Sequence, residues 1–193
     1  ENKIREKLDI IRDMGISHAF AGNIGAIEIL REKNFPIHGS HGLNITNTLS
    51  LSTYEELGLS DTALSFELTE KSIKAMGGSI KRGAYIYGFL PLMLMRSCPQ
   101  KDYGGCGSCD GRTHLTDRKN ISFPVICSNK EFSVLHNSVP LYIGDKEIKN
   151  IDFRILYFTT ETKKECENIY HSAKKGTNIP GAKTNGLFFR ELL

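Results

Sequence analysis

Strand and helix patterns alternate four times in the first half of the chain, and this alternation limits the possible folds more than any other feature. We predict strands at residues 17–21, 36–40, 63–68 and 84–89, and helices at residues 3–14, 24–30, 48–57 and 70–76. Such alternation is typical of a parallel sheet with helices packed outside it, and short, similar units favour a (β/α) barrel of the TIM type. Four units are half of such a barrel. The expected fold class is therefore α/β with a partial barrel.

The second half of the chain has a different pattern. A loop rich in Gly and Cys begins at residue 98, and we predict a β-hairpin from residues 121–128 and 132–143, then a terminal strand at 152–159 and a helix at 162–173. We therefore expect βα repeats in residues 1–97, with residues 98–193 packed on the same domain. The chain begins at Glu1 instead of Met, so we expect a fragment or a processed product, and four βα units describe part of a larger barrel.

Composition and charge exclude several classes of protein. The chain is 39% hydrophobic and 24% charged, as in a globular protein, and its formal charge of +3 is too small to indicate nucleic acid or membrane by electrostatics alone. Its longest apolar stretch, residues 83–95, is shorter than the roughly 20 residues of a membrane-spanning helix. We expect no membrane partner, and the open edges of a partial barrel predict a homo-oligomer.

The cysteines are the strongest local signal for chemistry. Four of the five crowd into 30 residues, as Cys98, Cys106, Cys109 and Cys127, and Cys166 follows later. Their odd number and the lack of an export signal favour free thiols in the cytoplasm over disulfides. Glycines around the C-x2-C pair allow tight turns that bring thiolates together, and zinc or a 4Fe-4S cluster accepts four such ligands. Scattered structural thiols are the alternative.

Polar residues that follow the predicted strands are the candidates for catalysis and substrate binding. We predict catalytic roles for Glu67, His38 and His41, and substrate binding by Asn44, Asn47, Tyr87 and Arg118. Ordinary structural roles are the alternative: the two asparagines as turn or cap residues, Glu67 in a salt bridge, and the arginine in an ion pair. The remaining histidines, including His18, are interpreted as packing or surface residues. H-E-x-x-H and G-x-S-x-G, two common hydrolase motifs, are absent.

Six short motifs occur in order between about residues 17 and 169. They are HGSHGLNITNTLSL from 38, LSFELT from 64, YGFLPLMLMRSCP from 87, LTDR from 115, FPVIC from 123 and NSVPLY from 137. Together they resemble the U32 peptidase family, the collagenase-like proteases. The resemblance implies the later strands of a barrel-like domain, in a protein whose missing N-terminal part would supply the earlier strands. It also implies proteolytic activity and a peptide substrate.

Some proteins that this chain resembles are iron-sulfur proteins. They support oxygen-independent hydroxylation of an RNA base or a quinone, with prephenate implicated as the oxygen source. This resemblance implies a cluster held by Cys98, Cys106 or Cys109, Cys127 and Cys166, and it adds RNA or a small anionic substrate as possible partners.

Three functions therefore stay open at the level of sequence. The first is a U32-type peptidase with a Cys-ligated metal site, and the second is the iron-sulfur protein. The third is a non-enzymatic accessory domain stabilised by zinc.

Overall fold

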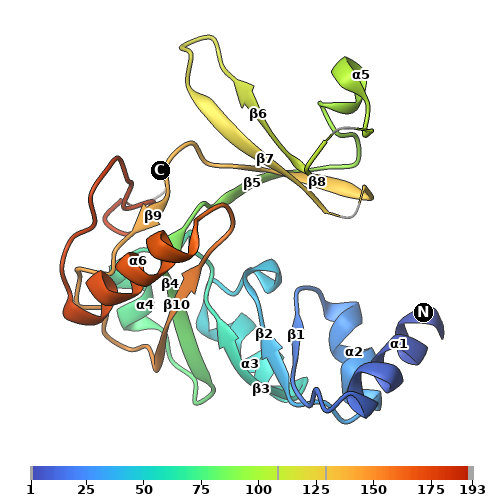
Figure 1. Ribbon diagram of the computed structural model, residues 1–193. Helices are drawn as coiled ribbons and strands as arrows, with labels where there is room; N and C mark the ends of the chain where they lie inside the picture. Colours follow the sequence, from blue (N-terminus) through green and yellow to red (C-terminus); the bar gives the residue numbers. More distant parts are fainter. Residues whose placement is uncertain (1, 108, 129, 191–193) are drawn as a thin grey trace. The chain divides into compact units, whose positions relative to one another are not determined.

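The computed structural model describes residues 2–107, 109–128 and 130–190, and the chain forms two compact units (Figure 1). Unit 1 consists of residues 1–86, 146–155 and 185–193, and unit 2 consists of residues 87–145 and 156–184. The chain is thus a mixed α/β protein, with a sheet of mainly parallel strands and a separate antiparallel sheet.

Unit 1 contains parallel strands that pair in the order of the sequence. The strands are β1 (Ala19–Ala21), β2 (Ile37–Gly39), β3 (Leu59–Ala63) and β4 (Lys81–Gly88), the last of which ends in unit 2. The connecting helices are α2 (Ile24–Glu32), α3 (Thr48–Glu56) and α4 (Glu70–Ala75), and α1 (Asn2–Asp13) precedes the first strand. This arrangement confirms the predicted alternation and the parallel pairing of the strands.

Local capping explains where the connecting helices begin. The side chains of Asn23, Asn47 and Thr69 each accept a hydrogen bond from a backbone N–H in the first turn of α2, α3 and α4. Asn47 and Ser50 form a reciprocal capping box. Each bond satisfies a donor that the helix itself leaves unpaired, so these polar residues fix the start of each helix.

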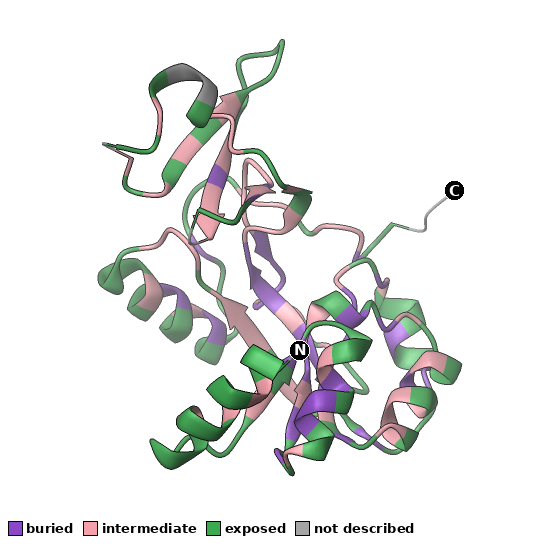
Figure 2. Cartoon of the chain, turned by 90° about the vertical axis from the view of Figure 1, so that its right-hand side faces the viewer, coloured by how far each residue is buried: buried purple, intermediate pink, exposed green. Residues whose placement is uncertain are grey.

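The two faces of the parallel sheet differ in burial. Ala21 and Ile37 are buried, on the strands against which α2 packs, and Figure 2 shows the outer sides of the helices exposed to solvent. Alternation along the strands puts Phe20, His38 and Asp61 on the opposite face, where Phe20 is 77% exposed. We call the surface formed by these three residues the open face.

The predicted strand at residues 63–68 is wrong. The strand β3 lies earlier, at Leu59–Ala63, and a turn follows it. Leu64 and Leu68 in this segment are buried although they lie outside the strand. A buried turn therefore produced the apolar pattern that indicated a strand.

Unit 2 contains a four-stranded antiparallel sheet in the order β5-β8-β7-β6. Its strands are β5 (Pro91–Met95), β6 (Arg112–Thr116), β7 (Ser122–Ser128) and β8 (Phe132–His136). The pairing of β7 with β8 confirms the predicted hairpin, but its second strand is shorter than expected. The residues beyond it include a separate short strand, β9 (Leu141–Tyr142), which pairs with the end of β4. The strands β5 and β6 were not predicted.

The terminal strand and helix lie where the sequence predicts them. They are β10 (Phe153–Tyr157), which lies next to β4, and α6 (Lys163–Lys175), whose capping box joins Thr162 and Glu165. A short helix, α5 (Lys101–Gly104), lies in the Cys-rich segment. A buried cluster in unit 2 consists of Tyr87, Tyr142, Ile169 and Ile179. Across the described part of the chain, no helix has the length and apolar character needed to cross a membrane.

Candidate functional site

A chain of hydrogen bonds joins two histidines and a carboxylate at the open face of unit 1. Nδ1 of His38 lies 2.9 Å from each carboxylate oxygen of Asp61, and Nε2 of His38 lies 2.9 Å from Nδ1 of His18. The register of the sheet pairs His38 on β2 with Asp61 on β3, and His18 immediately precedes β1. Residues from three neighbouring strand segments are thus brought together, and we call this arrangement the His18–His38–Asp61 chain.

The Asp61 carboxylate fixes the direction of these hydrogen bonds. An ionised carboxylate only accepts, so Nδ1 of His38 carries the proton and Nε2 of neutral His38 has a lone pair. His18 then donates from its Nδ1, which leaves the lone pair on its Nε2. His18 is exposed, whereas the side chains of His38 and Asp61 are about three-quarters buried. The end of the hydrogen-bonded chain that carries Nε2 of His18 is therefore the end open to solvent. Such an arrangement can accept a proton from a bound water or hydroxyl group.

His41 lies in a second group of aromatic residues in unit 1. It belongs to the short helix η1 (His41–Leu43) after β2, and its Nδ1 lies 3.2 Å from the hydroxyl of Tyr85 on β4. The rings of His41 and Phe66 have centroids 5.8 Å apart. Burial lowers the pKa of His41, because the imidazolium would lose its hydration. The two predicted catalytic histidines therefore have different partners.

Glu67 does not lie in an apolar strand, as the sequence suggested. It is exposed in the turn after β3 and lines an open depression with Thr46, Lys71 and Ser72. The expected cost of a buried carboxylate therefore does not arise. Its catalytic role stays a prediction.

The predicted substrate-binding residues are spread over both units. Asn44 follows η1 in the left-handed conformation with φ 47°, and Asn47 caps α3, so both have the structural roles considered from the sequence. Arg118 is exposed in the connection between β6 and β7 in unit 2. Tyr87, also in unit 2, is buried and lines a cavity described below.

Four of the five cysteines line one cavity in unit 2. This thiol cavity has a volume of about 280 Å³, and its cysteines are Cys98, Cys106, Cys109 and Cys127. The backbone N–H of Gly111 donates to Sγ of Cys109 at 3.3 Å. All five cysteines are free thiols, and Cys166 lies on α6, outside the lining of this cavity.

The thiol cavity contains side chains that can bind a metal, but in the described residues they are not arranged to coordinate one. Four thiols in one cavity are a donor set that suits zinc or an iron-sulfur cluster. Within the described ranges of the chain, however, no three His, Cys, Asp or Glu side chains are arranged to hold a metal ion. Cys98, Cys106, Cys109 and Cys127 share this cavity, and Cys166 does not line it.

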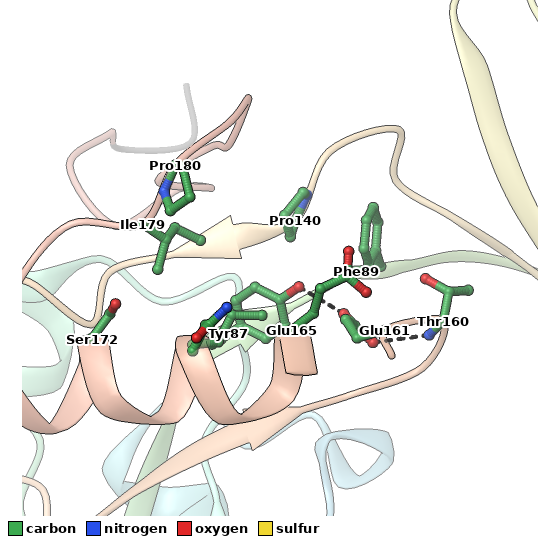
Figure 3. Close-up of a pocket in the computed structure, with 11 residues that line it drawn as sticks. Tyr87, Phe89, Pro140, Thr160, Glu161, Glu165, Ser172, Ile179 and Pro180 are labelled. Carbon is green, nitrogen blue, oxygen red and sulfur yellow. Dashed lines mark hydrogen bonds between the residues drawn. The ribbon is translucent and has the colours of Figure 1, made fainter. Parts of the chain in front are cut away.

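A further cavity of about 290 Å³ lies in unit 2 beside the start of α6 (Figure 3). The hydroxyl of Tyr87 donates to Oε1 of Glu161 at 2.7 Å, and the backbone N–H groups of Thr159 and Thr160 donate to Oε2. Burial and the neighbouring carboxylate raise the pKa of Tyr87, so its phenol stays protonated. We call this space the Tyr87 cavity.

Sequence reasoning missed His18, Asp61 and Tyr85. Asp61 was overlooked because the third strand was predicted too late in the chain, and His18 was interpreted as a packing or surface residue. The correct register would have placed Asp61 beside His38. No pattern in the sequence distinguishes His18, an exposed residue before the first strand, as a functional residue.

Comparison with known proteins gives one match. Residues 1–112 match the protein-family model described as peptidase family U32, a range that contains the His18–His38–Asp61 chain and three of the cysteines. Neither the curated proteins nor the solved structures include a match to the chain.

Proposed function

This chain belongs to peptidase family U32, and from that premise we propose that it hydrolyses peptide bonds with the His18–His38–Asp61 chain as its base. The observation that carries the proposal is the continuous set of hydrogen bonds from Asp61 through His38 to His18. The match to a peptidase family supplies the class of bond.

Water is the nucleophile in this proposal. The hydrogen bonds of His18 and His38 go to each other and to Asp61, with no serine or cysteine among their partners in the described residues. The oxygen of a water molecule attacks the peptide carbonyl carbon while Nε2 of His18 takes one of its protons. When the C–N bond breaks, His18 returns that proton to the leaving amine. His38 and Asp61 are positioning residues, because they hold the tautomer and orientation of His18.

Peptide hydrolysis by single-residue variants tests this proposal. Cleavage of a labelled gelatin or collagen-derived peptide should fall about 10²- to 10⁴-fold in His18→Asn, the range expected for loss of a general base. The matched control is His171→Asn, because His171 is an exposed histidine on α6 in the other unit. Equal rates for the two variants would overturn the proposed base.

The parallel strands support a partial TIM-type barrel as part of this proposal. The strands β1 to β4 neighbour one another in sequence order, and a helix connects each strand to the next. Consecutive neighbours of this kind are what a (β/α) barrel requires. A second copy of the chain would then cover the open edge. The five free thiols support a role in the cytoplasm.

A second proposed function is a metal centre in the thiol cavity. Cys98, Cys106, Cys109 and Cys127 would hold the metal, and the four thiols that share one cavity are the observation that favours it. A 4Fe-4S cluster would supply electron transfer, as in the hydroxylation of an RNA base or a quinone with prephenate, whereas zinc would stabilise the loop.

Metal analysis after anaerobic purification separates these possibilities. Iron with inorganic sulfide and a brown colour would favour the cluster, and colourless protein with zinc would favour a structural site. Cys109→Ser should lower metal content under either outcome, while Cys166→Ser, outside the cavity, should leave it unchanged. Metal-free protein, or loss of metal only in Cys166→Ser, would contradict the proposed ligand set.

A further inference from the structure

The Tyr87 cavity in unit 2 combines apolar walls with two carboxylates, and the Lys183 ammonium donates to the carbonyl oxygen of the lining residue Ile179 at 2.9 Å. Its lining comes from the end of β4 and the residue after it, the segment before β9, the turn before α6, one side of α6 and the segment after α6. The lining residues are Tyr87, Phe89, Pro140, Thr160, Glu161, Glu165, Asn168, Ile169, Ser172, Ile179 and Pro180. This set contains two carboxylates and no lysine, arginine or histidine. Its volume of about 290 Å³ is close to the lower end of small-ligand sites.

The two carboxylates lie toward one end of the cavity. Figure 3 shows Glu161 and Glu165 toward the end that holds Phe89, with Ile179 and Pro180 at the other end. Close to the carboxylates, the Thr159 hydroxyl is buried and has no hydrogen-bond partner among the described residues. A ligand that fits this polarity has one charged end and an apolar body.

Both carboxylates are held in place by the turn that begins α6. Glu161 accepts hydrogen bonds from the Tyr87 hydroxyl and from two backbone N–H groups. Oε2 of Glu165 accepts from the backbone and hydroxyl of Thr162, each at 2.7 Å. These bonds lower the pKa of Glu165, so its charge persists at neutral pH. A carboxylate has about four acceptor positions, so each can still accept a hydrogen bond from a ligand.

We propose that the Tyr87 cavity binds an organic cation, an ammonium or guanidinium group on an apolar chain. The charged group lies between Glu161 and Glu165 beside the Phe89 ring, and the apolar chain packs on Ile169, Ile179 and the two prolines. Charge complementarity favours a cation over an anion, and an aromatic ring adds a cation–π contact. A free amine and a basic side chain of a peptide share this chemistry. The site is independent of the peptide hydrolysis proposed for unit 1.

Binding of small probes to the whole chain tests this assignment. Benzylamine is the cationic probe, and benzyl alcohol is its neutral counterpart of similar shape. Titration monitored by ¹⁵N NMR should shift the amide signals of α6 and of residues 87–89 with benzylamine but not with benzyl alcohol. A lysine capped at both ends by acetyl and methylamide groups distinguishes the two sources. If it binds as tightly as benzylamine, the site accepts peptide side chains, and if only benzylamine binds, the site takes free amines.

Substitutions at two glutamates on α6 provide a matched pair of variants. Glu165→Gln removes the charge but keeps a side chain that a capping box accepts, so α6 should still form. Loss of a charged hydrogen-bond partner should weaken benzylamine binding about tenfold. Glu167→Gln is the control, because Glu167 is 58% exposed, pairs with Lys163 and does not line the cavity. Its affinity for benzylamine should equal that of the natural chain.

Several results would overturn the assignment. Benzyl alcohol that binds as tightly as benzylamine would show an apolar site without charge selection. Equal benzylamine affinity in Glu165→Gln and Glu167→Gln, with circular dichroism showing both folded, would show that the Glu165 carboxylate does not bind the ligand. Absence of any shift with benzylamine would exclude the site. None of these readouts depends on peptide cleavage.

Discussion

The His18–His38–Asp61 chain and the thiol cavity hold reactive groups in different ways. In unit 1, parallel strands place the three side chains beside one another, and each of the hydrogen-bond distances between their nitrogen and oxygen atoms is 2.9 Å. In unit 2, four thiols lie on loops and strand ends around one cavity, without a finished metal geometry in the described residues. Strand register fixes a site before any ligand arrives, whereas a loop-built site needs its ligand to complete it.

Asp61→Asn should produce the largest effect, and it tests how much the fixed chain depends on one acceptor. The amide can donate to Nδ1 of His38 and so favour the wrong tautomer, which breaks the direction of the hydrogen bonds. We expect peptide cleavage to fall about 100-fold, measured as kcat/KM, with unchanged metal content in unit 2. Asp13→Asn, at the exposed end of α1, should have no effect. A cleavage rate of Asp61→Asn within twofold of that of Asp13→Asn would show that Asp61 has no role in the reaction.

A pair of glycine substitutions compares the rigidity of the two regions. A Cβ at Gly39 would lie 2.2 Å from the Thr62 side chain, whereas a Cβ at Gly107, between Cys106 and Cys109, would have nothing within 4 Å. Gly39→Val should lower the free energy of unfolding by about 1–3 kcal/mol, because β2 and β3 must separate. Gly107→Val should change it by less than about 0.5 kcal/mol. Urea unfolding measures both, and equal losses would contradict the contrast between strand and loop.

Part of the pH dependence of stability in unit 1 should come from His41, and this is the smallest expected effect. Burial lowers the pKa of folded His41 below its ordinary value of 6.5. As pH falls below about 6.5, the unfolded chain therefore binds a proton that the folded chain does not, and stability decreases.

Hydrogen exchange at pH 7.5 and pH 5.5 should show this loss of protection at the amides of β2 and β3. His41→Gln should reduce the pH effect in unit 1, and His171→Gln should not. An equal loss of protection at β2 and β3 in His41→Gln and in the natural chain would contradict the assignment to His41.

The sequence predicts those elements that local chemistry specifies. Asn47 is considered a turn or cap residue from the sequence and caps α3 in the structure, and α6 begins within one residue of the helix predicted from residue 162. The hairpin of β7 and β8 follows from two strand patterns with a short break. Family membership also follows from the order of the motifs.

Properties that depend on distant contacts could not be predicted in the same way. Leu64 and Leu68 are buried by contacts outside their own segment, so their apolar pattern indicated a strand where the chain forms a turn. Because the third strand was predicted too late in the chain, the pairing of Asp61 with His38 was not predicted. The pairing of His18 with His38 depends on sheet register, which one sequence does not specify.

Long-range ¹H–¹⁵N NMR of the histidine rings tests the central claim most directly, because it identifies which nitrogen carries the proton. The His18–His38–Asp61 chain predicts a proton on Nδ1 and none on Nε2 for both His18 and His38 at neutral pH, and Asp61→Asn should abolish this preference in His38. Rapidly averaged tautomers in the natural chain, or a proton fixed on Nε2 of His38, would contradict it.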